Sequence, residues 1–434
     1  MNSPFSCGAA RAEITPEASW YPMYPGFFTE EIHDNYLVGA LDPQYVRAIA
    51  VRNADTTVLF VSFDLGAVPC GPKMAKLLSQ ETGVPEERIF LTATHTHNVA
   101  ALGHREKLMD NPMFLRFREA RPEIAEHHLL YERRIWDGAV SAAKEALASL
   151  RSARLGIGYA NSYVNVNRDQ LYAGGWGMGF NAEGHSDKTL AVIRFEDGEG
   201  RPIALIANYA VHAIVMFLNR CLHGKGGTTG DLPGVVSNAY ETNHPGAVCM
   251  WTPAANGNQN PIIMTYYGYP DFATGRVYES TVEGGAYEFL TVLAARHYAD
   301  LLRAEGSIAD YADNIDLRAV REAVEVPART DIPPRFGPGP DDRPGFQRIW
   351  LSGLTLGDIF FYGIGGELYS DVGARLKALS PFHHTLICSQ CYTTAGYMMG
   401  DEALLAPTLF AQRTRWVPGT LVPALEGFLK RFEK

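Results

Sequence analysis

Residues 88–98 read RIFLTATHTHN, an apolar run that ends in two histidines two positions apart. An earlier β-rich run at 57–64, TVLFVSFD, is followed by a helical pattern over 73–82. A strand, a helix of about three turns and a second strand form a βαβ unit, whose strands pair in parallel. Alternation along the second strand then places His95 and His97 on one face, just past its C-terminal end. Ligands bind at this edge of open α/β sheets, so the two histidines are candidates for a binding site.

The alternation of strands and helices continues along the chain and predicts an α/β fold. Strands are predicted at 45–53, 153–159, 189–195, 203–209 and 247–252, and helices at 124–150, at 286–303 and from Asp231, a candidate N-cap. Residues 347–354 and 358–364 predict a β-hairpin, and a helix is expected to begin at Gly365-Gly366-Glu367. This alternation predicts a mixed, largely parallel sheet flanked by helices, and no composition break separates independent domains.

The composition limits the class of protein. The chain has 434 residues, a formal net charge of −10 and 46% hydrophobic residues, which is typical of a soluble globular protein. No basic surface for nucleic acid is indicated, and no segment approaches the ~20 apolar residues of a membrane span. The first residues lack the basic and apolar regions of a signal peptide, and six scattered cysteines suit reduced thiols. We therefore expect a cytoplasmic protein without a nucleic-acid partner.

Four further side chains are candidates for chemistry, but each also has an ordinary structural explanation. Zinc binds neutral imidazole, so the histidine pair and His212, which ends another apolar run, are candidate ligands. A hydrogen-bonded, half-buried histidine is the alternative for His212, and a first-turn charge favoured by the helix dipole is the alternative for Glu367. Tyr392 and Tyr397 flank a Thr-Thr-Ala-Gly segment and suit amphipathic packing. Spacing alone leaves open whether these residues meet.

The order of these segments resembles the N-terminal catalytic domain of the neutral ceramidase family, which are zinc-dependent amidases. The similar segments are, in chain order, Gly8–Pro16, the VSFDLG that contains Asp64, the THTH of 94–97, Asn165–Arg168, Asp187–Leu190, Asn208–His212, Gly230-Asp231, Gly257–Pro261, Gly366-Glu367 and Gly396-Tyr397. The match is collinear over nearly the whole chain. It implies the fold of that family and one catalytic domain over residues 1–434, without the family's C-terminal β-sandwich domain.

The resemblance also implies a Zn²⁺ site. The family holds zinc with two histidines, a glutamate and a tyrosine, which correspond here to His95, His212, Glu367 and Tyr397, with Tyr392 as the competitor for the last position. His97 would hydrogen-bond the substrate carbonyl or transfer protons, and Arg168 would bind a polar group of the substrate. Further candidates for substrate binding are Asn98, Asp64, Asn256, Asn258 and Tyr392. Such an N/O ligand set also accepts other divalent ions.

The implied function is that of a zinc-dependent hydrolase in which a metal-activated water cleaves an amide bond. Three departures from the family concern the substrate. Asn98–Leu102 replaces the family's S-G-P-G-G, a family serine falls at Ala254 or Ala255, and residues 104–123 and 262–280 are insertions. We expect a small or medium-sized substrate other than ceramide, with the insertions acting as lids or as an interface between copies of the chain. The alternatives are a zinc esterase or lactonase, and a catalytically silent ligand-binding relative.

Overall fold

A mixed sheet forms the centre of the molecule. The structure is a computed structural model that describes residues 3–26, 36–54, 56–100, 102, 114–115, 118–119, 121–332, 343–408 and 410–432. Within these residues the main sheet has nine strands, eight of them in the order β12-β10-β9-β6-β1-β3-β4-β5, with β16 paired to β1. The strands are β1 Ser3–Glu13, β3 Tyr45–Arg52, β4 Thr57–Phe63, β5 Ile89–Ala93, β6 Arg151–Asn161, β9 Thr189–Glu196, β10 Pro202–Tyr209, β12 Val248–Pro253 and β16 Asn314–Ile315.

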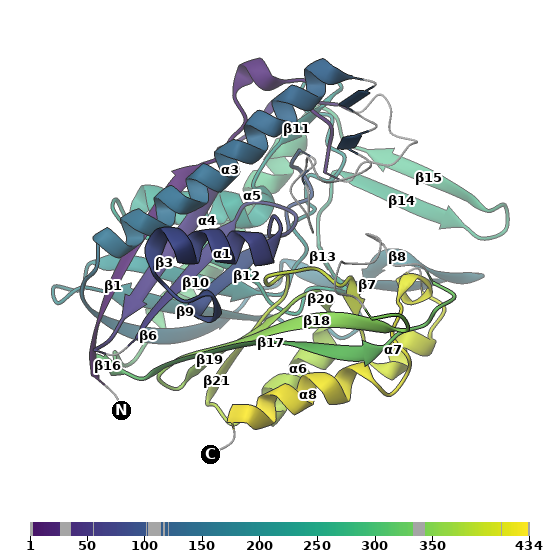
Figure 1. Cartoon of the computed structure of the whole chain (residues 1–434). Coiled ribbons are helices and arrows are strands. Elements are labelled where there is room, and N and C mark those ends of the chain that lie inside the picture. Colours follow the sequence, from purple (N-terminus) through teal and green to yellow (C-terminus); the bar gives the residue numbers. More distant parts are fainter. Residues whose placement is uncertain are drawn as a thin grey trace.

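Two sheets stack face to face between two layers of helices (Figure 1). One face of the main sheet packs against α1 (Gly71–Thr82), α3 (Pro122–Ala148), α4 (Asp231–Asn243) and α5 (Ala286–Gly306). The other face packs against a second sheet, β17 (Leu317–Pro327), β18 (Phe346–Leu356), β19 (Ile359–Ile364) and β21 (His384–Cys388), which α6 (Ser370–Leu379) and α8 (Leu421–Leu429) cover from outside. Because both faces of the main sheet are covered, strands such as β4, β5, β10 and β12 are almost entirely buried. None of the helices formed by the described residues has the length and hydropathy of a membrane span.

The predicted α/β class is confirmed, but the prediction of a largely parallel sheet is wrong. Strands β4 and β5 do pair in parallel on either side of α1, which confirms the βαβ unit, and β10 pairs in parallel with β12. The remaining neighbours along the main sheet are antiparallel. Short connections explain the difference, because a few residues, such as those between β3 and β4, can join only antiparallel neighbours.

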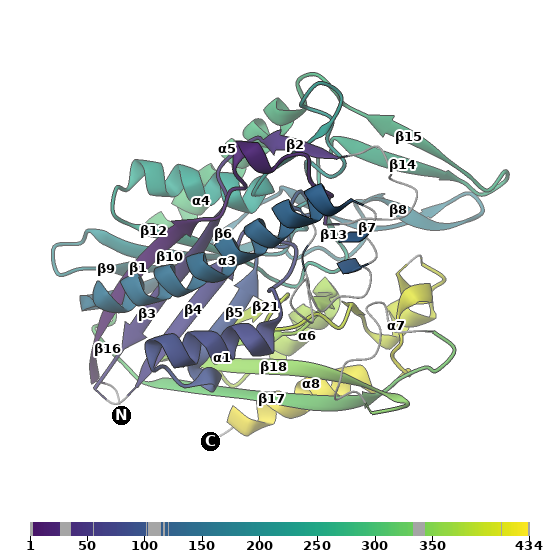
Figure 2. The same cartoon turned by 45° about the horizontal axis from the view of Figure 1, so that its top comes forward.

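Smaller sheets stand at the end of the main sheet where β5 and β10 finish. They are β7 (Asn165–Tyr172) with β8 (Gly175–Asn181) and β13 (Gln259–Pro261), β14 (Tyr266–Asp271) with β15 (Arg276–Thr281), β20 (Glu367–Leu368) with β22 (Tyr397–Met398), and β2 (Leu37–Ala40) with β11 (Gly226–Thr228). The predicted insertion 262–280 therefore contains the hairpin β14–β15, which projects from the body in both views (Figures 1 and 2). Most of the other insertion, 104–123, lies outside the described residues.

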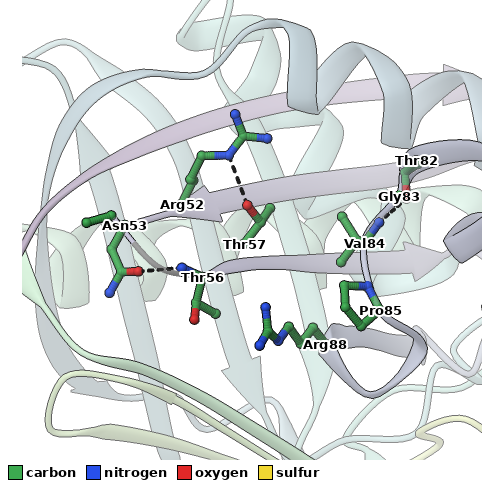
Figure 3. Close-up of a pocket in the computed structure, with 10 residues that line it drawn as sticks. Arg52, Asn53, Thr56, Thr57, Thr82, Gly83, Val84, Pro85 and Arg88 are labelled. Carbon is green, nitrogen blue, oxygen red and sulfur yellow. Dashed lines mark hydrogen bonds between the residues drawn. The ribbon is translucent and has the colours of Figure 1, made fainter.

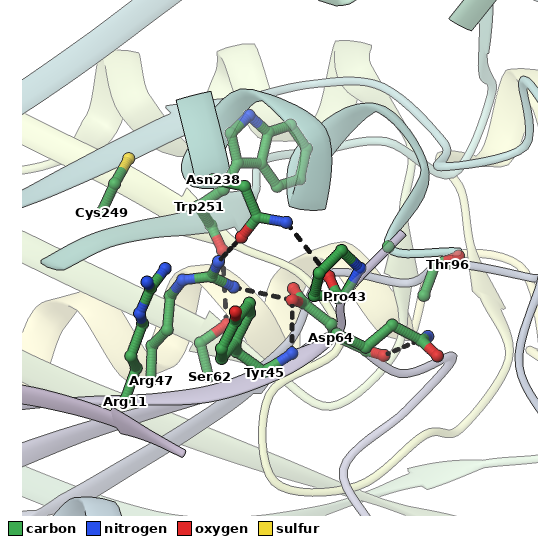
Figure 4. Close-up of polar contacts among 12 residues, drawn as sticks. Arg11, Pro43, Tyr45, Arg47, Ser62, Asp64, Thr96, Asn238, Cys249 and Trp251 are labelled. Atoms are coloured by element: carbon green, nitrogen blue, oxygen red, sulfur yellow. Dashed lines mark hydrogen bonds and ion pairs between the residues drawn. The ribbon is translucent and has the colours of Figure 1, made fainter. Parts of the chain in front are cut away.

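A buried group of charges joins the main sheet to α4 (Figure 4). The Arg47 guanidinium on β3 donates to Asp64 Oδ2 at 2.7 Å through Nη1 and to Glu241 Oε1 at 2.8 Å through Nε. The backbone N–H of Tyr45 donates to the same Asp64 oxygen at 2.9 Å. Arg11 also donates to Glu241. The carboxylate of Asp64, predicted to bind substrate, thus has two partners within the fold, and the buried amide of Gln44 donates to the main-chain carbonyl of the same residue.

Replacing Arg47 by methionine is expected to destabilise the protein by about 3–5 kcal/mol, because it leaves two buried carboxylates without their shared cation. The measurement is the free energy of unfolding in urea. Arg11→Met is the matched control, because Arg11 touches the same Glu241 but its side chain is 38% exposed. If Arg11→Met lowered the free energy of unfolding as much as Arg47→Met does, burial of the arginine would not explain the loss of stability.

Candidate metal centre

The first histidine of the THTH segment is held by the turn that follows β5. His95 has a φ of 66°, in the left-handed region, so the chain bends after Ala93 and does not continue as a strand. The backbone N–H of His95 donates to Leu65 O at 2.9 Å, and its Nδ1 lies 2.6 Å from Gly66 O. Because a carbonyl only accepts, Nδ1 carries the proton and Nε2 presents a lone pair. This is the tautomer that a metal ligand needs.

The second candidate ligand is held in the same way. His212 follows β10, is fully buried, and has its Nδ1 2.6 Å from Asn256 O. Its backbone N–H donates to Gln259 O at 2.9 Å. The Nε2 of His212 therefore also presents a lone pair, and it lies 3.1 Å from Glu367 Oε2.

Glu367 lies in a strand, so the helix predicted to begin at Gly365 is wrong at this point. Its backbone N–H donates to Gly396 O at 2.9 Å, and β20 pairs in parallel with β22, with Glu367 opposite Tyr397. The helix α6 begins only at Ser370. The explanation of Glu367 as a first-turn charge is therefore excluded. Its Oε2 lies 3.5 Å from His95 Nε2, so the carboxylate points between the two imidazoles.

These side chains converge on one point. The ligand nitrogens of His95, His97 and His212 lie within 4.8 Å of one another, and Nε2 of His97 is 3.3 Å from Nε2 of His95. For zinc bonds of about 2.1 Å in tetrahedral geometry, neighbouring ligand atoms lie about 3.4 Å apart. The separations of 3.1, 3.3 and 3.5 Å measured here match that spacing. The cluster can hold a metal ion, and its donor atoms suit zinc.

The protonation states also suit a cation. Burial lowers the pKa of His212 to about 3, and the positive charge of Arg168 acts in the same direction. Burial likewise lowers the pKa of His97 well below its usual value. Burial alone would raise the pKa of Glu367, but its contacts with His212 and His95 outweigh burial and hold this pKa well below the usual range. Near neutral pH His97 and His212 are thus neutral imidazoles and Glu367 is a charged carboxylate, the forms that bind metals.

Arg168 and Tyr397 stand beside this cluster. The guanidinium carbon of Arg168, on β7, lies 5.1 Å from the ring centroid of Tyr397 and 4.0 Å from that of Phe410. Its Nη2 donates to Gly257 O. The side chain is 2% exposed, so a fixed positive charge faces the centre from a largely desolvated position. Phe410 was not found from the sequence, because a single aromatic residue near the C-terminus has no distinguishing signal.

Comparison with known proteins identifies the fold. No protein-family model matches the chain, and no curated protein matches it in sequence. The structure of neutral ceramidase from Pseudomonas aeruginosa matches with a TM-score of 0.73 and 18% identity, over 98% of this chain and 74% of that chain. A ceramidase complexed with C2 matches with a TM-score of 0.73 and 16% identity over the same shares of the two chains. The chain has the neutral ceramidase fold. The fold expected from the motif order is therefore confirmed.

Within this ceramidase fold, the two candidate tyrosines have different surroundings. Tyr397 lies next to Glu367 across β20 and β22. Tyr392 packs with its ring centroid 5.1 Å from that of Trp350, and its ring is 4.0 Å from the guanidinium carbon of Arg321. The geometry favours Tyr397 as the residue beside the metal centre. Tyr392 supports the core under α1 instead.

The asparagines predicted to bind substrate are engaged within the fold. Asn98 Nδ2 donates to Asp231 Oδ2 at 2.9 Å, and Asn258 Oδ1 accepts from the backbone N–H of Ser370 at 3.0 Å. Asn256 contributes its carbonyl to His212, as described above. Asp231 is the first residue of α4 and not its N-cap, with a φ of 53°. The three asparagines therefore form hydrogen bonds within the fold around the candidate site, and their contact with a substrate stays a prediction.

Sequence reasoning missed the backbone carbonyls that orient the two candidate histidine ligands. Gly66 and Asn256 accept these hydrogen bonds through backbone carbonyls, which every residue type has, so the sequence cannot indicate them. Gln390, whose Nε2 lies 3.5 Å from His95 Nε2, stands between Cys388 and Cys391 and was not singled out. Its φ of 56° turns the chain toward the centre.

A hollow of about 340 Å³ lies elsewhere on the molecule (Figure 3). It is lined by residues at the start of β4 and before β5, among them Arg52, Thr57 and Arg88. His95 follows the opposite end of β5, so this hollow lies at the other edge of the sheet from the metal centre. The polar groups of Arg52 and Asn53 shown in Figure 3 bond to neighbouring residues of the fold. We assign it no part in the chemistry.

Proposed function

We propose that this chain is a zinc-dependent hydrolase that cleaves an amide bond in a small or medium-sized substrate other than ceramide. One observation carries the proposal: Nε2 of His95, Nε2 of His212 and Oε2 of Glu367 converge at zinc-ligand spacing, with both Nδ1 atoms fixed by carbonyls. The similarity of fold to proteins named ceramidases supports hydrolysis of an amide. The replacement of the family's S-G-P-G-G by Asn98–Leu102 after THTH, together with the insertions, argues against ceramide as substrate.

His95, His212 and Glu367 would hold the ion, with Tyr397 as the fourth ligand. A bound zinc ion supplies a Lewis acid for a carbonyl oxygen and brings the pKa of water close to neutrality. The chain's own contribution is rigidity, because the carbonyls of Gly66 and Asn256 fix both rings before any ligand arrives.

His97 is the proposed proton-transfer group. Its ring packs edge-on against His95, with centroids 4.7 Å apart, and is half-buried, so it borders the centre while a substrate can reach it. Desolvation keeps it neutral near pH 7, and a neutral imidazole can accept a proton from water and return it to a leaving nitrogen. Arg168 would hold a polar group of the substrate with its fixed charge.

Water is the proposed nucleophile because the family's serine is absent. Ala254 and Ala255 stand at its place, and both are buried. We also propose that residues 1–434 form one catalytic domain. The proposed ligands come from the turn after β5, the end of β10, and strands β20 and β22, so they span most of the chain.

Metal content tests the proposal directly. Protein purified without chelator is expected to contain about one zinc ion per chain, measured by inductively coupled plasma mass spectrometry. Removing the ion with a chelator should lower the rate on a panel of amides by more than about 100-fold, and added zinc should restore it.

A panel of matched esters and lactones runs beside the amides. Turnover of esters alone would replace the amidase proposal with the esterase alternative. Zinc binding without turnover of either panel would favour the silent ligand-binding relative, and full activity in the metal-free protein would refute a metal-dependent mechanism.

A further inference from the structure

Two aromatic rings extend the metal centre toward the projecting hairpin. The ring centroid of Phe217 lies 5.7 Å from that of His97, and the ring of Tyr266, at the start of β14, lies 5.9 Å from that of Phe217. Both contacts are edge-to-face, at 82° and 83°. Phe217 and Tyr266 are each only half-buried, so part of each ring is exposed. We call this pair the aromatic wall.

The turn that carries Phe217 is held by the buried carboxylate of Asp231. The Asp231 carboxylate accepts from the backbone N–H of Val215 at 3.2 Å and from that of Met216 at 2.9 Å. Leu218 then adopts a φ of 51°, a conformation that non-glycine residues rarely take. Strained backbone of this kind persists only where the surroundings enforce it, and it gathers at binding sites. The turn thus presents Phe217 to His97 without needing a ligand.

Tyr266 is tied to the same turn. The backbone N–H of Thr265 donates to Val215 O at 2.8 Å, and that of Val282 donates to Thr265 O at 2.8 Å, which joins both ends of the hairpin to the turn. The Tyr266 hydroxyl donates to Glu279 Oε1 at 2.8 Å and fixes the ring. The two halves of the aromatic wall therefore form one rigid surface. These hydrogen bonds at the base of the hairpin connect the insertion 262–280 to the turn that carries Phe217.

We propose that the aromatic wall binds an apolar, planar group on the amine side of the substrate. This inference rests on the proposed hydrolase function, because it uses the assignment of His97 as the proton donor to the leaving nitrogen. A nitrogen within hydrogen-bonding reach of His97 carries its substituent next to Phe217. Half-exposed aromatic rings bind flat apolar groups by edge or face contact. The substrate class is thus an amide of an aromatic or similarly flat apolar amine.

The test measures binding without turnover. N-benzylmethanesulfonamide and N-methylmethanesulfonamide are matched probes, because amide hydrolases do not cleave the sulfonamide bond. Titration calorimetry on the zinc-loaded protein is expected to show the benzyl probe binding about three- to tenfold more tightly than the methyl probe. Phe217→Ala should abolish this preference, and Phe217→Leu, which keeps apolar volume, should retain part of it. Zinc content reports whether each variant is intact.

Tyr278→Ala is the matched control, since Tyr278 lies on β15 of the same hairpin but is 56% exposed, and it should leave the preference unchanged. Equal binding of the two probes by the native protein, or a preference that survives Phe217→Ala, would overturn the inference. These outcomes do not depend on catalysis, so failure of the proposed function would appear separately, in the amide and ester panels.

Discussion

The His212→Ala protein is expected to lose its metal and its activity together. His212 is fully buried, and its Nε2 is one of the three atoms that converge at zinc-ligand spacing. Its removal takes away one ligand and leaves the Glu367 carboxylate beside a cavity. Replacement of residues that only support metal ligands already costs about 10–100-fold, so loss of a ligand should lower the hydrolysis rate by more than about 100-fold.

The measurement pairs zinc content with amide hydrolysis in the same preparation. Glu367→Gln keeps the shape of the side chain but removes its charge, and it should show the same joint loss. The control is His384→Ala, because His384 lies on β21 and bonds to Tyr159 instead of the cluster. A variant at position 212 or 367 that retained both zinc and full activity would refute the ligand assignment.

Local sequence patterns predicted the elements better than their arrangement. The predicted strands at 45–53 and 57–64 and the helix at 73–82 agree closely with β3, β4 and α1, because apolar runs and their breaks are local signals. The share of parallel pairing was overestimated, since it depends on which strands become neighbours. The second sheet, β17-β18-β19-β21, was recognised only through its β18–β19 hairpin.

In the candidate site, too, local features were predicted from the sequence and contacts between distant segments were not. His95 and His212 were marked by their place after apolar strands, and those strands do end at the cluster. Glu367 was identified through the motif order while its local structure was mispredicted. Glycines before an acidic residue suggest a helix start, but pairing with residue 397, 30 positions along the chain, makes this segment a strand. Such a contact is non-local, and residue type near Glu367 does not encode it.

The choice between Tyr392 and Tyr397 needed the structure for a related reason. Both residues flank the same short segment, and the sequence favoured Tyr397 only through the resemblance of Gly396-Tyr397 to a family motif, with Tyr392 left as the competitor. The fold separates them because β22 lies beside β20, whereas the chain at Tyr392 returns to β5, with its backbone N–H donating to Leu91 O at 3.1 Å. The role of Tyr397 as a ligand stays a prediction.

The His97→Ala protein is expected to keep its zinc and lose most of its rate. His97 differs from the other two histidines in exposure, because it is half-buried, and in its neighbours, because Phe217 packs on its ring. Its backbone N–H donates to Ala213 O at 3.2 Å, which places the ring at the border of the site. A positioned acid–base group contributes about 10²–10⁴-fold to catalysis, so the turnover number should fall by that factor while zinc content stays near one per chain.

Zinc content is decisive here because the nitrogens of His97 lie close enough to the other imidazoles for a direct contact with the ion. Loss of zinc from His97→Ala would make His97 a ligand and would leave proton transfer to another group. Retention of zinc with an unchanged rate would remove it from the reaction altogether. His97→Gln sharpens the distinction, because glutamine can still hydrogen-bond a carbonyl but cannot accept and return a proton. A rate for His97→Gln close to that of His97→Ala would therefore identify proton transfer, and not hydrogen bonding to the substrate, as the contribution of this side chain.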